Sequence, residues 1–278
     1  MTVLTLALLV AGGAVCAGLL GALTGLGGGL VIVPMLTLIF HVDIRYAIGA
    51  SLVSVIATSS GAAAAYVREG FTNVRVGILL ETGTTIGALV GALISGFIPT
   101  SALAILFGVV LMYSAYQSLR PRAEHVLSDH PDKWALAFRL DSTYPTANGL
   151  QPYSVQGVPA GFALMFVAGI LSALLGIGSG IIKVLAMDHA MKLPFKVSTT
   201  TSNFMIGVTA AASAGVYLHD GRIDPAVAFP VMLGVLAGAL LGARILTHAN
   251  TTLLRRLFTI VVVVMAAEML YKGFTGGI

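Results

Sequence analysis

Two glycine-rich segments each interrupt an apolar run that would otherwise be long enough to cross a membrane. They are Thr24–Gly29 (TGLGGG) and Leu175–Gly180 (LGIGSG). Backbone groups freed by such a break are tolerated inside a bilayer only where protein or a polar cavity satisfies them. Matching breaks in two halves of a chain are typical of the binding site of a secondary transporter. We therefore expect the functional site to lie between these two segments.

The composition predicts a helical membrane protein. Of 278 residues, 57% are hydrophobic and 9% are charged, and the mean hydropathy is +0.97, whereas a soluble domain carries about 25% charged residues. The apolar runs are too long and continuous for barrel strands. The net charge of +4 is small and most basic residues lie between apolar runs, a pattern of membrane orientation rather than of nucleic-acid binding. The single cysteine, Cys16, excludes an intrachain disulfide.

The second half of the chain repeats the first without a gap, at an offset of 151 residues. The aligned pairs are Gly25/Gly176, Gly27/Gly178, Gly29/Gly180, Ser51/Ser202 and Tyr66/Tyr217. Two aligned small-residue ladders, Gly83/Gly87/Gly91 and Gly234/Gly238/Gly242, are expected to be helix-packing faces. We predict an all-α polytopic fold with two repeats, 1–119 and 158–278, each with a glycine-broken hairpin segment and three spanning helices.

The basic residues favour inverted repeats. If each glycine segment is a hairpin that returns the chain to its starting side, Arg45, Arg222 and Lys272 lie on one side of the membrane. Lys183 then lies within the membrane, and the other eleven Lys and Arg residues lie on the opposite side. If each segment crosses once, the split is eight to six. The positive-inside rule favours the hairpin arrangement, which places the linker in the cytoplasm.

The predicted linker, residues 120–157, is the most charged part of the chain. Two structures are expected equally. One is a short amphipathic helix around Trp134–Leu140 on the membrane surface, with Trp134 at headgroup level. The other is an irregular loop.

The glycine segments are the first candidate site. A helix that starts within hydrocarbon exposes unpaired N–H groups and a positive dipole end, which attract anions. The candidate residues are Thr24, Gly25, Gly27, Gly28 and Gly29 in the first repeat and Gly176, Gly178, Ser179 and Gly180 in the second. The alternative is that the glycines only permit close helix packing; recurrence in both halves favours the site.

The second candidate is a set of polar residues that begin an apolar run in each repeat. They are Ser51 in the first repeat and Thr201, Ser202 and Asn203 in the second. Hydroxyl and amide groups bind oxyanions without carrying charge, although helix capping and interhelical hydrogen bonds explain them equally well.

Ionisable residues within the apolar runs are few. Lys183 follows its glycine segment by three residues, where the first repeat has Ile32. It either supplies positive potential to an anion or snorkels to the cytoplasmic face. Glu81 and Glu268 are expected to snorkel rather than to relay protons. The histidines near span ends show no metal-ligand spacing.

These residues make the chain resemble the TauE/SafE family of membrane exporters. The matching features are Gly25–Gly29 with Pro34 after it, Ala50-Ser51-Leu52, Gly176–Gly180 followed by Thr201-Ser202-Asn203, and Tyr217-x-x-x-Gly221. The resemblance covers nearly everything except 120–157. It implies export of sulfite, a sulfonate or a related organic acid. Gly178-Ser179-Gly180 departs from the fully glycine form, and Leu185 stands where the first repeat has Pro34.

The predicted function is secondary transport of a small organic or inorganic anion, sulfite or an organosulfonate above others, by alternating access in the inner (plasma) membrane. The alternative is a membrane enzyme acting on a small anion or a lipid head group, although no nucleophile–base pair stands among the intramembrane residues. No catalytic residue, metal or cofactor is expected. The expected partners are the small anion and the lipid bilayer, without nucleic acid, and a homodimer is an assembly that the sequence allows.

Overall fold

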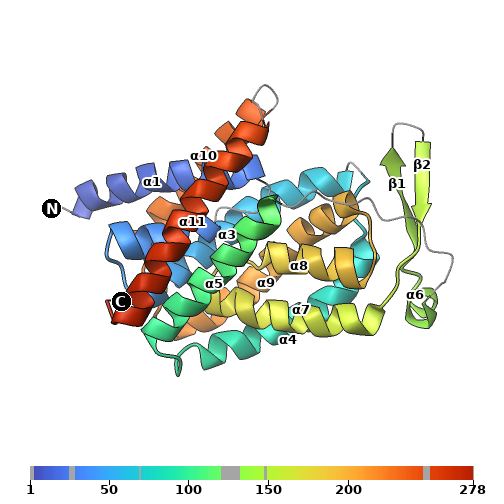
Figure 1. Ribbon diagram of the computed structural model, residues 1–278, viewed down its shortest axis with the longest axis horizontal. Coiled ribbons are helices and arrows are strands. Elements are labelled where there is room, and N and C mark those ends of the chain that lie inside the picture. The colour runs from blue at the N-terminus through green and yellow to red at the C-terminus, as the bar shows by residue number, and fades with distance from the viewer. Residues whose placement is uncertain are drawn as a thin grey trace.

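The computed structural model describes residues 3–24, 29–68, 70–119, 132–146, 149–246 and 251–277, and these fold almost entirely as helices (Figure 1). The helices are α1 (Val3–Thr24), α2 (Gly29–Pro34), α3 (Ile44–Arg68), α4 (Val74–Ile94), α5 (Thr100–Leu119), α6 (Lys133–Ala137), α7 (Val158–Leu175), α8 (Gly180–Leu185), α9 (Phe195–His219), α10 (Pro225–Leu246) and α11 (Thr251–Thr275). Two π-helical turns, η1 (Met35–Ile39) and η2 (Ala186–Ala190), continue α2 and α8. The strands β1 (Ser142–Thr146) and β2 (Gly149–Tyr153) form an antiparallel hairpin.

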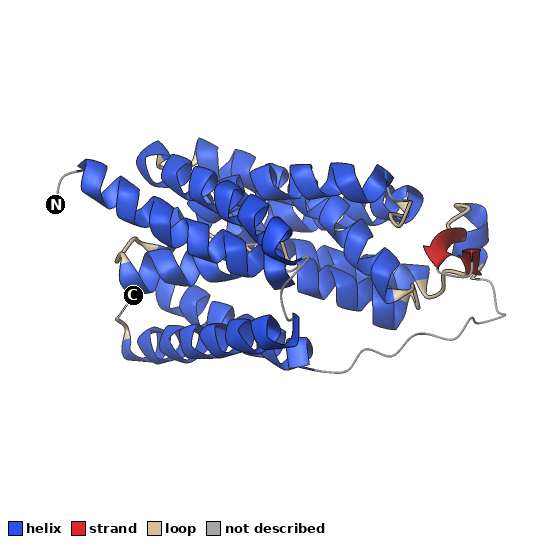
Figure 2. Ribbon diagram, turned by 90° about the horizontal axis from the view of Figure 1, so that it is seen from above, coloured by secondary structure: helices blue, strands red, loops and turns tan. Residues whose placement is uncertain are grey.

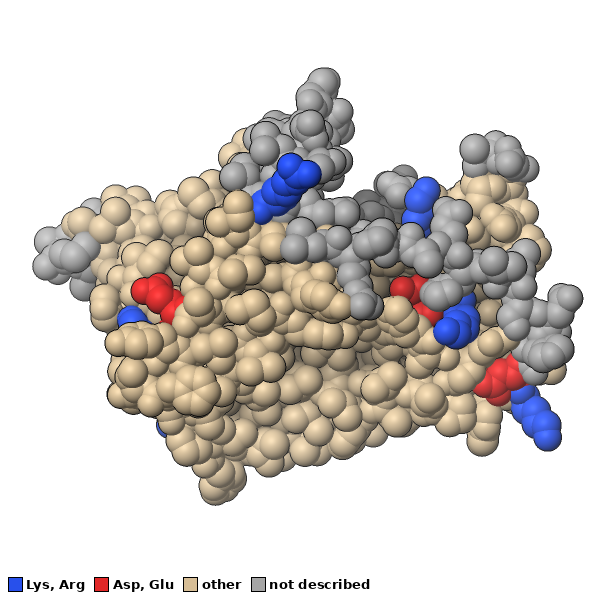
Figure 3. Space-filling view, viewed as in Figure 1, with Lys and Arg blue, Asp and Glu red and all other residues tan. Residues whose placement is uncertain are grey.

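The prediction of an all-α polytopic membrane protein is confirmed. Among the described residues, five helices are long and apolar enough to cross a membrane: α4, α7 and most of α5, α10 and α11. Large apolar side chains such as Ile86, Leu93 and Leu240 are exposed on them. On the face shown in Figure 3, charged side chains lie toward the two ends and in the upper half, and the lower middle shows none. An exposed apolar surface of this extent suits lipid rather than water.

The helices occur in the same order in both halves and pack across the halves. At the 151-residue offset, α2 corresponds to α8, α3 to α9, α4 to α10 and α5 to α11. Helix α1 packs on α10 and α7 packs on α4, while α3 pairs with α9 and α5 with α11. The α1–α10 and α7–α4 pairs are therefore equivalent to each other under the offset. The α3–α9 and α5–α11 pairs each join two equivalent helices.

Glycines of the two ladders allow these helices to touch. A Cβ on Gly87 of α4 would collide with the carbonyl oxygen of Phe166 on α7. The equivalent Gly238 of α10 meets the carbonyl oxygen of Val15 on α1 in the same way. Residues 15 and 166 are themselves related by the offset. Small residues at these contacts let the backbones approach closely, as helix pairs in membranes require.

The helices run along the long axis, and two groups of loops mark the opposite ends of the molecule (Figures 1 and 2). At the end that holds both termini, Arg45 donates to the carbonyl oxygen of Ile98 (2.9 Å) and Arg222 donates to Ser95 Oγ (3.0 Å). Helix α3 therefore begins at the end where α9 finishes. The inversion of the repeats relative to a membrane stays a prediction.

The linker forms a small unit at the other end of the molecule (Figure 2). Asp132 caps α6 through Trp134 N–H (2.9 Å) and accepts from Val158 N–H at the start of α7 (3.0 Å). The short helix α6 lies within the range where a helix was one of the two expectations, with Trp134 exposed and stacked on Phe138. The β1–β2 hairpin was not predicted.

Asn73 joins this unit to the helices. Its side chain caps α4 by accepting from Val76 N–H (3.1 Å), and it donates to the carbonyl oxygen of Leu140 and to Tyr153 Oη (2.8 Å each). Burial raises the pKa of Tyr153, so its hydroxyl stays neutral at physiological pH. Asn73 N–H also donates to Thr201 Oγ1 of α9 (3.0 Å).

Candidate functional site

The second glycine segment forms a tight buried turn between α7 and α8. Gly176 and Gly178 have φ values of +66° and +67°, in the left-handed region that glycine adopts without steric cost. A Cβ on Gly178 would lie 2.7 Å from Ile206 Cγ2. The N–H of Gly176 donates to the carbonyl oxygen of Ser172 (2.8 Å) and ends α7. The turn therefore needs its glycines for backbone conformation and for space.

The two halves of the chain meet at this turn. Ser51 Oγ of α3 donates to the carbonyl oxygen of Gly176 (2.7 Å), and Ser202 Oγ of α9 donates to that of Gly180 (3.2 Å). Gly29 lies against the same turn, since an added Cβ would be 3.1 Å from the carbonyl oxygen of Gly176. Five predicted site residues from both halves are thus brought together, although both serine hydroxyls donate to backbone here.

Ser179 occupies an unfavourable position in the turn. Its φ of +48° is in the left-handed region, where a residue with a side chain is strained, and the first repeat has Gly28 at this position. The side chain is 1% exposed, and its hydroxyl has no hydrogen-bond partner among the described residues. A buried unpaired hydroxyl costs about 1–3 kcal/mol. Two costs at one residue indicate a functional rather than a structural reason for the serine.

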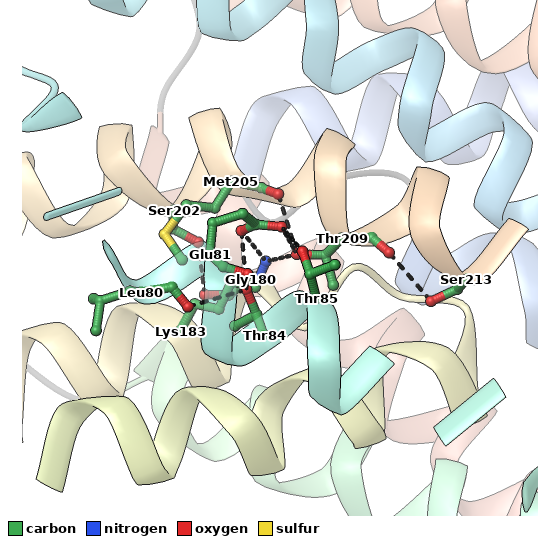
Figure 4. Close-up of polar contacts among 10 residues, drawn as sticks. All are labelled: Leu80, Glu81, Thr84, Thr85, Gly180, Lys183, Ser202, Met205, Thr209 and Ser213. Atoms are coloured by element: carbon green, nitrogen blue, oxygen red, sulfur yellow. Dashed lines mark hydrogen bonds and ion pairs between the residues drawn. The ribbon is translucent and has the colours of Figure 1, made fainter. Parts of the chain in front are cut away.

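A buried ion pair lies directly beside the turn (Figure 4). Lys183 of α8 is 0% exposed, and its Nζ lies 3.7 Å from Oε2 of Glu81 on α4. Lys183 Nζ also donates to Thr209 Oγ1 of α9, and the Thr209 hydroxyl donates to Glu81 Oε1 (2.7 Å). Three helices from both halves thus supply one connected polar network.

Two further hydroxyls on α4 hold the carboxylate of Glu81. Thr84 Oγ1 donates to Oε2 (2.9 Å) and Thr85 Oγ1 donates to Oε1 (3.1 Å). Figure 4 shows these groups and Thr209 gathered around the carboxylate. Hydrogen bonds to both oxygens offset part of the cost of burying the charge.

The network exists in only one of the two equivalent positions. The residues that correspond to Glu81, Lys183 and Thr209 are Met232, Ile32 and Thr58. The Thr58 hydroxyl donates to carbonyl oxygens of its own helix instead. The duplicated framework therefore carries a single charged centre.

The expectation that Glu81 snorkels is wrong. The side chain is buried and held by Lys183 and three threonines rather than reaching an aqueous face. Of the two interpretations of Lys183, snorkelling is also excluded, because the side chain is 0% exposed. The sequence signal that could have revealed this pair was the presence of one carboxylate and one ammonium, Glu81 and Lys183, each within an apolar run. Glu268 is exposed on α11.

The remaining predicted residues lie differently. Thr201 is 0% exposed and accepts from Asn73 N–H at the start of α4. Asn203 is half-buried within α9, and it does not join the network around Lys183. Gly25, Gly27, Gly28 and the side chain of Thr24 lie outside the described part of the chain. Within that part, no group of three or more His, Cys, Asp or Glu side chains could hold a metal ion.

Comparison with known proteins shows which family the chain resembles in sequence. The family model described as "Sulfite exporter TauE/SafE" matches residues 10–269. The "Probable membrane transporter protein YunE" of Bacillus subtilis is 29% identical over 265 residues, covering 92% of this chain and 94% of that protein. The "Probable membrane transporter protein MJ0441" of Methanocaldococcus jannaschii is 27% identical over 267 residues, covering 91% of each chain.

No solved structure is a significant match to this chain. The family match spans both repeats, both glycine segments and the buried ion pair, and the related proteins are matched over nearly their whole lengths. The chain belongs to the TauE/SafE family of membrane transporters.

Proposed function

We propose that the protein is a secondary transporter that exports a small anion, sulfite or an organosulfonate, across the plasma membrane by alternating access. The observation that carries this proposal is the fully buried ammonium of Lys183 beside a turn that breaks a membrane hairpin. A buried lysine in a membrane protein is costly and is kept for function. The family description names sulfite as a cargo, and the similar proteins are named as transporters.

The proposed site lies at the α7–α8 turn, where both halves of the chain meet. Lys183 supplies the positive charge, and Ser179 supplies a buried hydroxyl that has no hydrogen-bond partner among the described residues. The hydroxyls of Ser51 and Ser202 lie at the turn and exchange their backbone acceptors for the anion. These donors replace the hydration that an oxyanion loses when it enters the protein.

The repeat arrangement supports alternating access. We propose residues 1–119 and 158–278 as inverted repeats, with 120–157 as a cytoplasmic linker. Arg75 and Arg139 meet at the linker end, whereas Arg45 and Arg222 lie at the end with the termini. In this arrangement eleven of the fifteen basic residues lie on the linker side, so by the positive-inside rule we propose that the linker end faces the cytoplasm.

Transport by purified protein in proteoliposomes tests the proposal. Vesicles loaded with sulfite or with methanesulfonate should take up labelled substrate by counterflow, and the uptake should saturate with concentration. Empty vesicles and vesicles without protein are the controls. Conversion of sulfite to another compound would support the enzyme alternative, and the absence of any protein-dependent flux would contradict the proposal.

A further inference from the structure

The pair formed by Glu81 and Lys183 lies inside the protein, where the side chain of Lys183 is 0% exposed and that of Glu81 is 11% exposed, and its two charges balance. In the part of the chain that the structure describes, these are the only buried charged side chains. The cost of burying one charge without its partner is several kcal/mol. Each charge is therefore needed to hold the other, and any event that removes one must compensate the other.

Among the described residues, the ammonium of Lys183 makes one hydrogen bond, which leaves N–H groups for another acceptor. An ammonium has three N–H groups. One N–H group of Lys183 donates to Thr209 Oγ1. The carboxylate oxygen Oε2 is 3.7 Å from Nζ, which exceeds the length of a hydrogen bond. Glu81 is held more closely by Thr84, Thr85 and Thr209, at 2.7–3.1 Å. The carboxylate thus neutralises Lys183 without using its donors directly.

An anion that enters this site changes the balance of charge. A monovalent oxyanion beside the ionised pair would leave one uncompensated negative charge in the protein interior. The uptake of one proton by Glu81 removes that charge, since the carboxylate becomes a neutral acid while Lys183 pairs with the oxyanion. The proton comes from the aqueous phase and forms an O–H bond to a carboxylate oxygen.

We propose that Glu81 is an internal substitute for the substrate, which neutralises Lys183 when no anion is bound and takes up one proton for each monovalent anion that binds. This inference rests on the proposed function. One anion and one proton then occupy the protein together, and the direction of net transport follows the combined gradient of both.

Among the described residues, the side-chain contacts of Glu81 are with three threonines and Lys183, and no further titratable group is in contact with it. The described residues of α7 carry none, and those of α8 carry only Lys183. The other titratable groups on the surrounding elements are Arg75 near the start of α4, Lys196, Tyr217 and His219 toward the two ends of α9, and Asp188 and His189 of η2. Arg75 donates to the linker, Tyr217 donates to the carbonyl oxygen of Ala173, and Asp188 pairs with His189.

Proton uptake on binding tests the inference. Methanesulfonate is the probe, because it remains anionic across the accessible pH range, whereas sulfite takes up a proton itself near neutrality. Its binding to the purified full-length protein is measured by calorimetry in buffers with different ionisation enthalpies. Near neutral pH we expect about one proton taken up per anion, and an affinity that rises by up to about tenfold per unit fall in pH.

Two variants assign the proton. The double variant Lys183→Met/Glu81→Gln removes both charges together, because Lys183 without its partner would itself lose a proton and regain it with the anion. This variant should bind methanesulfonate more weakly, without proton uptake and with the same affinity at every pH. Glu268→Gln changes an exposed glutamate of α11 and should behave as the unaltered protein.

Binding by the unaltered protein without proton uptake would overturn the inference and leave the proposed function standing, even if the double variant does not fold. Uptake of one proton by the double variant would also overturn it, because a group other than Glu81 or Lys183 would carry the proton. If the unaltered protein neither binds nor transports methanesulfonate or sulfite, the proposed function fails and the inference fails with it.

Discussion

The α7–α8 turn holds a serine where glycine would be more stable. Ser179 has a left-handed backbone, a buried side chain and a hydroxyl without a described partner. The equivalent residue of the first repeat is glycine. This position is where the chain gives up stability for a polar group beside Lys183.

Replacing Ser179 by glycine should therefore raise stability and lower anion affinity. The gain in free energy of unfolding is expected to be about 1–3 kcal/mol, from relief of the left-handed strain and of the unpaired hydroxyl. The loss of one hydrogen bond to the anion should weaken binding by about two- to tenfold. Thermal unfolding in detergent and methanesulfonate titration measure the two effects.

Ser179→Ala is the matched control, because it removes the hydroxyl but keeps a Cβ in the left-handed region. It should lose the same affinity as Ser179→Gly with a smaller gain in stability. Unchanged affinity in both variants would show that the hydroxyl does not contact the anion.

The residues that line the site were only partly predictable from the sequence. The glycine segments and Ser51 and Ser202 were found because they recur at the repeat offset. The pairing of Glu81 with Lys183 was missed because it joins α4 to α8 and has no counterpart in the repeat, where Met232 and Ile32 stand. A symmetric pattern cannot reveal the residues at which the symmetry is broken.

At the level of helices, Asn73 connects the start of α4 with two other parts of the molecule. It caps α4, donates to Leu140 and Tyr153 of the linker, and its N–H donates to Thr201 of α9. The equivalent residue Asp224, before α10, accepts from Ala226 N–H in the same local manner. Of these two caps, the Asn73 side chain is the one that also forms hydrogen bonds with the linker.

Asn73→Ala should lower the free energy of unfolding by about 1–3 kcal/mol, since it removes a helix cap and two buried hydrogen bonds. Asp224→Ala, the matched control, should cost less because it removes an exposed cap alone. Thermal unfolding of both variants in the same detergent makes the comparison. Equal losses would mean that the linker adds nothing to the stability of the helices.

At the scale of the whole molecule, most of the helical architecture could be predicted from the sequence. The order of helices and the short hairpin arm after each glycine segment follow from apolar run lengths and the repeat offset. The exchanged packing of α1 on α10 and α7 on α4 does not, because contacts between distant segments leave no local pattern. The β1–β2 hairpin was likewise hidden in a polar stretch without alternating hydrophobicity.

On the proposed function, one charged centre within a duplicated framework predicts one anion per protein, bound at Lys183. Removing the ammonium alone would strand a buried carboxylate, so the informative comparison removes the carboxylate from both proteins. Glu81→Gln retains Lys183, and the double variant Lys183→Met/Glu81→Gln lacks both charges. The two proteins thus differ only in the cation. Lys133→Met, in the exposed part of the linker, controls for the loss of a lysine elsewhere.

Counterflow of labelled methanesulfonate through these proteins in proteoliposomes, over a range of concentrations, is the most direct test. We expect the double variant to require about 10- to 100-fold more anion for half-maximal uptake than Glu81→Gln, as the loss of a charge-assisted hydrogen bond implies. Lys133→Met should match the unaltered protein. Equal half-saturation in the double variant and Glu81→Gln would show that the anion binds away from Lys183.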